Sequence, residues 1–144
     1  ITLGMWGSGD VVGKSLSTID PYQVECLTQV EATNFPVRDW QNREAALFAS
    51  VQQVEELLVI RSYKRTDEML IKLLSWLAKR FGRSAAKGQL IDLRLTHQDL
   101  SELLGSTRVT VTRLLSQFEQ QGLIERLPLH RIVLKQEDFW HYEI

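Results

Sequence analysis

Cysteine is nearly absent from this chain of 144 residues, which contains only Cys26. One cysteine cannot form a disulfide within the chain, and alone it cannot supply the ligands of a zinc or iron–sulfur site. The sequence also has no apolar run long enough to cross a bilayer and no signal peptide at its start. We therefore expect a protein of the reducing cytoplasm that has no membrane partner.

Net charge is equally small, because 17 basic and 18 acidic side chains leave a formal charge of −1. Any surface that binds nucleic acid must then be a local basic patch. Signatures of catalysis are missing too, since we find no nucleophile–base–acid set and no paired carboxylates at useful spacing. The three histidines, His97, His130 and His141, have no metal-ligand spacing. The sequence therefore predicts no enzyme and no metal site.

Two helices joined by a tight turn are predicted between residues 95 and 124. Thr96 is a suitable N-cap, with Asp99 three residues later in the capping-box position. Gly105 provides the positive φ of a sharp helix exit, Ser106 or Thr107 can cap the next helix, and Gly122 ends it. The second helix has an apolar stripe with i, i+3, i+4, i+7 spacing, consisting of Val111, Leu114, Leu115 and Phe118.

The opposite face of this second helix has an unusual composition. Arg108 and Arg113 stand there among small hydroxyl and apolar side chains, and no acid precedes Glu119. Arginine binds guanine bidentately in the major groove, and small apolar groups contact the thymine methyl. We expect this helix to read DNA. A helical hairpin buried in some core, or a winged helix that binds protein and not DNA, is the alternative.

The rest of the chain predicts, in order, short strands, a long helix and the remaining elements of a winged helix. Residues 1–35 are predicted to be β-structure, with strands over residues 22–27 and 30–35. A helix over residues 40–63 is followed by a charged hinge over residues 61–67. The next helix is capped by Thr66 or Asp67, a short strand covers residues 89–95, and two more cover 123–126 and 131–134. Residues 138–142 are predicted to be a packed aromatic tail.

The helix over residues 40–63 has an apolar stripe that steps by four, three and four residues. This spacing is that of a coiled-coil seam, and the stripe consists of Leu47, Val51, Val54 and Leu58. It predicts a two-stranded dimer interface. The alternative is that the helix is buried against the strands before it, and both can hold on different faces.

Residues 95–100, 105–108 and 110–114 resemble the winged-helix motif of the CRP/FNR family of bacterial transcription regulators. The run from Ser106 to Leu115 is most similar to the cyanobacterial nitrogen-control (NtcA) type. The resemblance implies an α+β chain in three parts. Residues 1–38 would be the C-terminal part of a β-roll (cupin-like jelly roll) effector domain, 39–65 a long dimerisation helix and hinge, and 66–144 a winged helix-turn-helix domain. Because the chain starts at Ile1 in an apparent strand, we expect an N-terminal part of the roll to precede it.

The resemblance also implies a function. Family members are homodimers that bind double-stranded DNA, act on RNA polymerase, and place the helix around residues 107–121 in the major groove. Three residues match base-reading positions: Arg108, Val109 and Arg113. Seven match positions that contact phosphates or flanking bases: Thr96, His97, Gln98, Ser106, Thr107, Thr110 and Thr112. Val109 replaces the Glu of cyclic-AMP-type regulators. The resemblance to the nitrogen-control type, which reads a palindrome with GTA and TAC arms, implies the same kind of site here.

The effector site departs from the family pattern. Cyclic-nucleotide sites of the family use Gly-Glu and Arg-Ser/Thr pairs, and the matching stretches here are residues 13–16 and 21–24, which contain neither Glu nor Arg. A cyclic phosphate without a facing cation binds poorly. The sequence therefore disfavours a cyclic nucleotide, identifies no cofactor and leaves the effector, and the choice between activator and repressor, unassigned.

Overall fold

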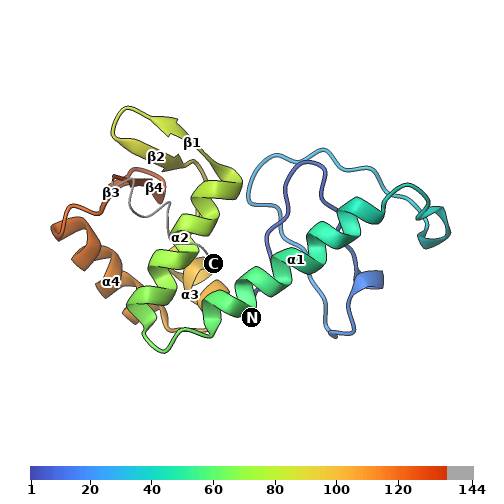
Figure 1. The fold of residues 1–144 in the computed structure, drawn as a ribbon, viewed down its shortest axis with the longest axis horizontal. Helices are drawn as coiled ribbons and strands as arrows, with labels where there is room; N and C mark the ends of the chain where they lie inside the picture. Colours follow the sequence, from blue (N-terminus) through green and yellow to red (C-terminus); the bar gives the residue numbers. More distant parts are fainter. Residues whose placement is uncertain (136–144) are drawn as a thin grey trace.

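The computed structural model describes residues 1–135 and forms two halves side by side (Figure 1). One half contains the long helix α1, Glu44–Arg61, with the N-terminal segment wound along it. The other contains three helices and a four-stranded antiparallel sheet. This arrangement confirms the α+β class. The tail predicted over residues 138–142, and His141, lie outside the described residues.

The strands expected within residues 1–35 are not formed, and that part of the prediction is wrong. Only two short 3₁₀ turns, Lys14–Leu16 and Val37–Asp39, interrupt the irregular backbone before α1. The alternation of apolar and polar side chains favours a strand, but a strand also needs a neighbouring strand that hydrogen-bonds to its backbone N–H and C=O groups. None of the described strands pairs with this segment. The segment is held to α1 instead, since the main-chain N–H of Met5 donates to Gln53 Oε1 at 2.5 Å and Ser50 Oγ donates to the carbonyl of Val11 at 3.1 Å.

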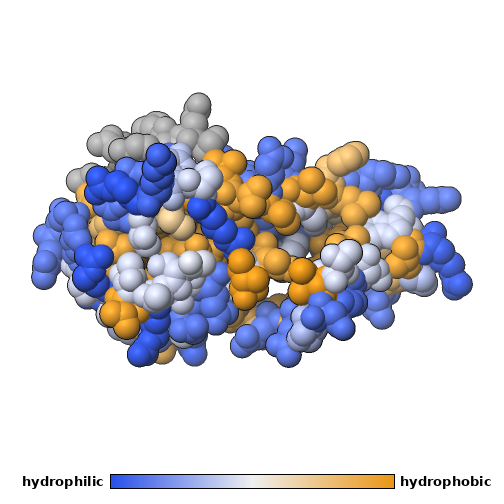
Figure 2. Space-filling model, turned by 90° about the horizontal axis from the view of Figure 1, so that it is seen from below, coloured by the Kyte–Doolittle hydropathy of each residue, from blue (hydrophilic) through white to orange (hydrophobic). Residues whose placement is uncertain are grey.

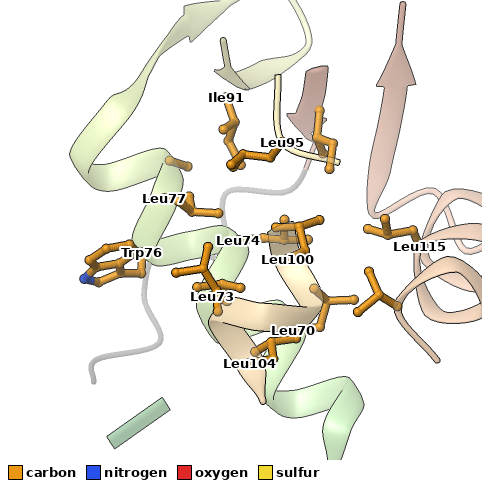
Figure 3. Close-up of a cluster of buried hydrophobic side chains, with 14 of the residues drawn as sticks. Leu70, Leu73, Leu74, Trp76, Leu77, Ile91, Leu95, Leu100, Leu104 and Leu115 are labelled. Atoms are coloured by element: carbon orange, nitrogen blue, oxygen red, sulfur yellow. The ribbon is translucent and has the colours of Figure 1, made fainter. Parts of the chain in front are cut away.

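Helix α2, Thr66–Phe81, forms the centre of the second half. Its N-cap is Arg65, which pairs with Asp67 at 2.6 Å, so the expected cap at Thr66 or Asp67 is wrong by one or two residues. Its apolar face is buried through Leu70, Leu73, Leu74 and Leu77, and Phe81 at its end is half-buried. Figure 3 shows side chains of α2, β2, α3 and α4 meeting in one cluster, which includes Leu70, Leu73, Leu74, Leu77, Ile91, Leu100, Leu104 and Leu115.

The sheet has the strand order β1-β2-β4-β3, with every neighbouring pair antiparallel. The bounds are Gly82–Ala85 for β1, Gly88–Ile91 for β2, Ile124–Leu127 for β3 and Arg131–Leu134 for β4. Strands β3 and β4 agree with the strands predicted over residues 123–126 and 131–134. The strand predicted over residues 89–95 ends at Ile91, and β1 was not predicted. Gly88 allows β2 to approach β4, because a Cβ there would lie 1.9 Å from the carbonyl oxygen of Leu134.

Candidate nucleic-acid interface

Helices α3, His97–Leu104, and α4, Arg108–Gln120, form the predicted pair. A full capping box starts α3: Thr96 Oγ1 accepts from the N–H of Asp99 at 3.0 Å, and the Asp99 carboxylate accepts from the N–H of Thr96 at 2.7 Å. Gly105 ends the helix with φ 69°, in the left-handed region. Thr107 caps α4 by accepting from the N–H of Thr110 at 3.2 Å. The predicted caps and turn are confirmed.

Thr96→Ala removes the capping oxygen of α3, and we expect it to lower the free energy of unfolding by about 1 kcal/mol. The melting temperature should then fall by about 2–4 °C, measurable by circular dichroism. Thr28→Ala is the matched control, because the Thr28 hydroxyl donates only to the neighbouring Gln29 carbonyl in an exposed segment. Equal melting temperatures of the Thr96 variant and the control would contradict this role.

The buried stripe of α4 orients the rest of the helix. Val111, Leu114, Leu115 and Phe118 are all buried against the core, as predicted. The opposite face is therefore turned to solvent, and Val109 is 73% exposed. Arg108, Thr112 and Arg113 are exposed on the same helix. The fold thus presents the predicted base-reading residues outward.

Neither Arg108 nor Arg113 forms an ion pair with any acidic side chain of residues 1–135. The first acid of α4, Glu119, is engaged elsewhere, because Arg126 of β3 donates to it from Nε, from Nη2 and from its main-chain N–H. These contacts lower the pKa of Glu119 below its usual value. Two guanidinium groups with free donors are therefore available to an outside acceptor.

The hydroxyl and amide residues around the two helix starts are partly occupied within the protein. Gln98 Nε2 donates to Glu102 at 2.9 Å, and Thr107 Oγ1 donates to Thr110 Oγ1 at 2.9 Å. Ser106 is half-buried in the turn between the helices. The N-termini of α3 and α4 nevertheless carry partial positive charge, which suits anionic phosphates.

His97 lies at the start of α3, where the structure adds contacts that the sequence did not reveal. Its Nδ1 is 2.8 Å from Thr112 Oγ1 on α4, and its ring centroid is 6.1 Å from that of His130. Burial lowers the pKa of His97, and the positive charges of His130, Arg126 and Arg108 lower it further. His97 is thus part of a basic cluster and not an isolated histidine.

The wing is the turn between β3 and β4, and its tip is residues 128–130. Leu129 and His130 have φ values of 64° and 59°, so both adopt the left-handed conformation at the tip. The bonds from Arg126 to Glu119 fasten the wing to the C-terminal end of α4. The sequence pattern does not identify Glu119, Arg126 and His130 as members of this surface, because no helical or strand periodicity links the wing to α3 and α4.

The apolar stripe of α1 is largely uncovered. The opposite face packs on the protein through Gln53, Leu57 and Ile60, each about 1% exposed. Four side chains of the other face are exposed: Phe48 by 67%, Val51 by 64%, Val54 by 51% and Leu58 by 65%. Leu47 is half-buried. Figure 2 shows hydrophobic side chains gathered over the half of the molecule that contains α1 and the N-terminal segment.

Two features that would bear on function are absent from residues 1–135. Within residues 1–135, no three His, Cys, Asp or Glu side chains lie close enough together to hold a metal ion. The described helices include none with the length and hydrophobicity needed to cross a membrane.

Comparison with known proteins adds a family to this geometry. Residues 69–138 match the model of the Crp-like helix-turn-helix domain. The regulatory protein CysR of Synechococcus elongatus is 47% identical over 129 residues, which cover 88% of this chain and 62% of CysR. The global nitrogen regulator of a Nostoc species is 29% identical, over 82% of this chain and 60% of that protein. The chain thus spans less than two thirds of the length of these relatives.

Solved structures show the same fold. A CooA variant from Carboxydothermus hydrogenoformans superimposes with a TM-score of 0.62 at 25% identity, over 67% of this chain and 44% of CooA. A CRP-family transcriptional regulator from Thermus thermophilus gives a TM-score of 0.60 at 15% identity, over 74% of this chain and 55% of that one. The chain therefore has the same fold as a protein to which it is only 15% identical.

Proposed function

The chain belongs to the CRP/FNR family of regulators, and from this premise we propose that it is a dimeric, sequence-specific transcription regulator that binds DNA through α4. The observation that carries the proposal is the outward face of α4. Its two arginines have no acidic partner among the described residues, while the opposite face is fully buried. A helix held in this way fits the major groove, which admits one α-helix.

Each residue of the face receives a role by its position. Arg108 and Arg113 bind guanine edges with paired N–H donors, and Val109 contacts a thymine methyl. Thr96, His97, Gln98, Ser106, Thr107, Thr110 and Thr112 surround the two helix starts and contact phosphates or flanking bases. This division separates residues that specify sequence from residues that set the position on the duplex.

The identity of residue 109 predicts the site. Val109 cannot accept a hydrogen bond from cytosine N4, which the Glu of cyclic-AMP-type regulators can do. The nitrogen-control type, which the run from Ser106 to Leu115 resembles, reads a palindrome with GTA and TAC arms, and we expect binding-site selection from a random duplex library to return the same arms. A TGTGA consensus would contradict this assignment, and recovery of no consensus would favour the protein-binding alternative.

Dimerisation follows from the exposed stripe on α1. A second copy of the helix would cover Leu47, Val51, Val54 and Leu58, whose spacing suits a two-stranded coiled coil. Two copies related by a twofold axis would place their α4 helices in major grooves about 34 Å apart, one helical turn of DNA. The palindrome and the symmetry of the protein would then match.

Each of the three parts of the chain has a role in this proposed function. Residues 1–38 belong to an effector domain whose ligand is unassigned, residues 39–65 link the protomers, and residues 66–144 bind DNA. The protein acts in the cytoplasm on RNA polymerase. A gel shift on the selected palindrome, compared with a scrambled duplex of equal length at two salt concentrations, tests the central claim.

A further inference from the structure

A groove of about 360 Å³ lies between the start of α3, the core side of α4 and the wing. Four of its lining residues are basic or titratable: His97, Arg126, His130 and Arg131. Among the described residues that line it, none is acidic. The acids nearest to these arginines are already paired, Glu119 with Arg126 at 2.8 Å and Asp92 with Arg131 at 3.6 Å. Because each of these two ion pairs is neutral overall, His97 and His130 are the groups of the lining that would add charge towards an anion.

The hydrogen bonds of Thr112 determine which nitrogen of His97 carries the proton. The hydroxyl of Thr112 has one hydrogen, which it donates to the main-chain carbonyl of Arg108 at 2.9 Å. Towards His97 Nδ1, at 2.8 Å, the same oxygen can only accept. This arrangement favours the tautomer of neutral His97 that has its hydrogen on Nδ1. Its other nitrogen, Nε2, has a bare lone pair, which repels a phosphate oxygen.

Charged groups on every neighbouring element affect His97. His130 and Arg126 on the wing side and Arg108 on α4 are cationic or can become so, and together with burial they lower the pKa of His97. Arg131 is held by Asp92. On the same helix, the Asp99 carboxylate is occupied by the capping box, and Glu102 by Gln98. Burial, together with these cations, thus favours the neutral imidazole in the free protein.

We propose that a backbone phosphodiester of DNA binds in this groove, beside His97 and His130, together with one proton, which is taken up by His97 Nε2. The proposal rests on the DNA binding proposed above and specifies how one phosphate is held. Protonation turns Nε2 from a repelling acceptor into a charged donor, while Nδ1 keeps its bond to Thr112. DNA binding and proton uptake are therefore linked.

The sign of the pH dependence follows from this linkage. The phosphodiester raises the pKa of His97 in the complex, whereas its neighbours lower it in the free protein. Between those two pKa values the complex binds more protons than its components, so affinity rises as pH falls. The gain is at most about tenfold per pH unit for each bound protomer, because one proton is taken up.

Isothermal titration of the full chain with the palindromic duplex, at constant salt in PIPES and in Bis-Tris, measures the protons taken up. We expect uptake of up to one proton per protomer near neutral pH. His97→Gln should abolish the uptake at saturating duplex and weaken binding through the loss of one phosphate contact, whereas His130→Gln should retain the uptake. In the free protein at pH 8, a long-range ¹H–¹⁵N spectrum should show His97 as the Nδ1–H tautomer, and this readout needs no variant.

Four outcomes would overturn the proposal. These are specific binding without proton uptake, unchanged uptake in His97→Gln, uptake lost only in His130→Gln, and an Nε2–H tautomer of His97. In all four the proposed regulator function survives. Absence of sequence-specific binding at every pH would instead remove the proposed function, and this inference with it.

Discussion

Replacing Arg113 by alanine should abolish most of the sequence preference of this protein while leaving its binding to random DNA nearly unchanged. A lost bidentate contact to guanine costs about 1–3 kcal/mol. Because a palindrome presents the contact twice, the loss is about 2–6 kcal/mol, or roughly thirtyfold and more in affinity. Arg108→Ala should behave in the same way. Fluorescence anisotropy measures the dissociation constant of each variant for the palindromic duplex and for the scrambled duplex.

The control for this experiment is Arg38→Ala. Arg38 is an exposed arginine of the second 3₁₀ turn, in the half of the molecule away from α4 (Figure 1), and its loss changes the net charge by the same amount. The affinity of the Arg38→Ala variant for the palindrome should stay close to that of the wild type. If the Arg113 variant loses affinity equally for both duplexes, the arginine contacts phosphate and does not read bases.

Replacing Leu58 by glutamate should convert the dimer to a monomer. Leu58 is 65% exposed in the single protomer, so a charged side chain there is solvated and leaves the protomer folded. In a dimer the carboxylate would be buried in an apolar seam, at a cost on the order of several kcal/mol per ion. Val54→Glu should have the same effect. Sedimentation velocity at several concentrations distinguishes the two states.

Gln52→Glu is the matched control, since Gln52 is exposed on the same helix but lies off the apolar stripe. This variant should remain dimeric. The monomeric variants should also lose affinity for the full palindrome and keep only the weak binding of one half-site. A wild-type protein that sediments as a monomer at high concentration would contradict the proposed interface.

The features that followed from the sequence are local. Thr96 with Asp99 predicted the start of α3, and Gly105 predicted its left-handed end, because these residues satisfy or shape the backbone a few positions away. The stripe of α4 predicted which face is buried, since helical spacing places those side chains on one side. The outward position of Arg108 and Arg113 is a direct consequence. Their contacts with DNA stay a prediction.

The features that only the tertiary structure decided depend on residues far apart in the chain. The strands expected in residues 1–35 failed because alternation does not provide a pairing partner. The contact of His97 with Thr112, and its place beside His130, appear only when the wing folds back along α3 and α4. The sequence by itself thus determined the helices, the caps of α3 and α4 and the face of α4, through interactions between residues within about two helical turns. Packing between distant segments decided the sheet order and the basic groove, because nothing in the local pattern records which surfaces will meet.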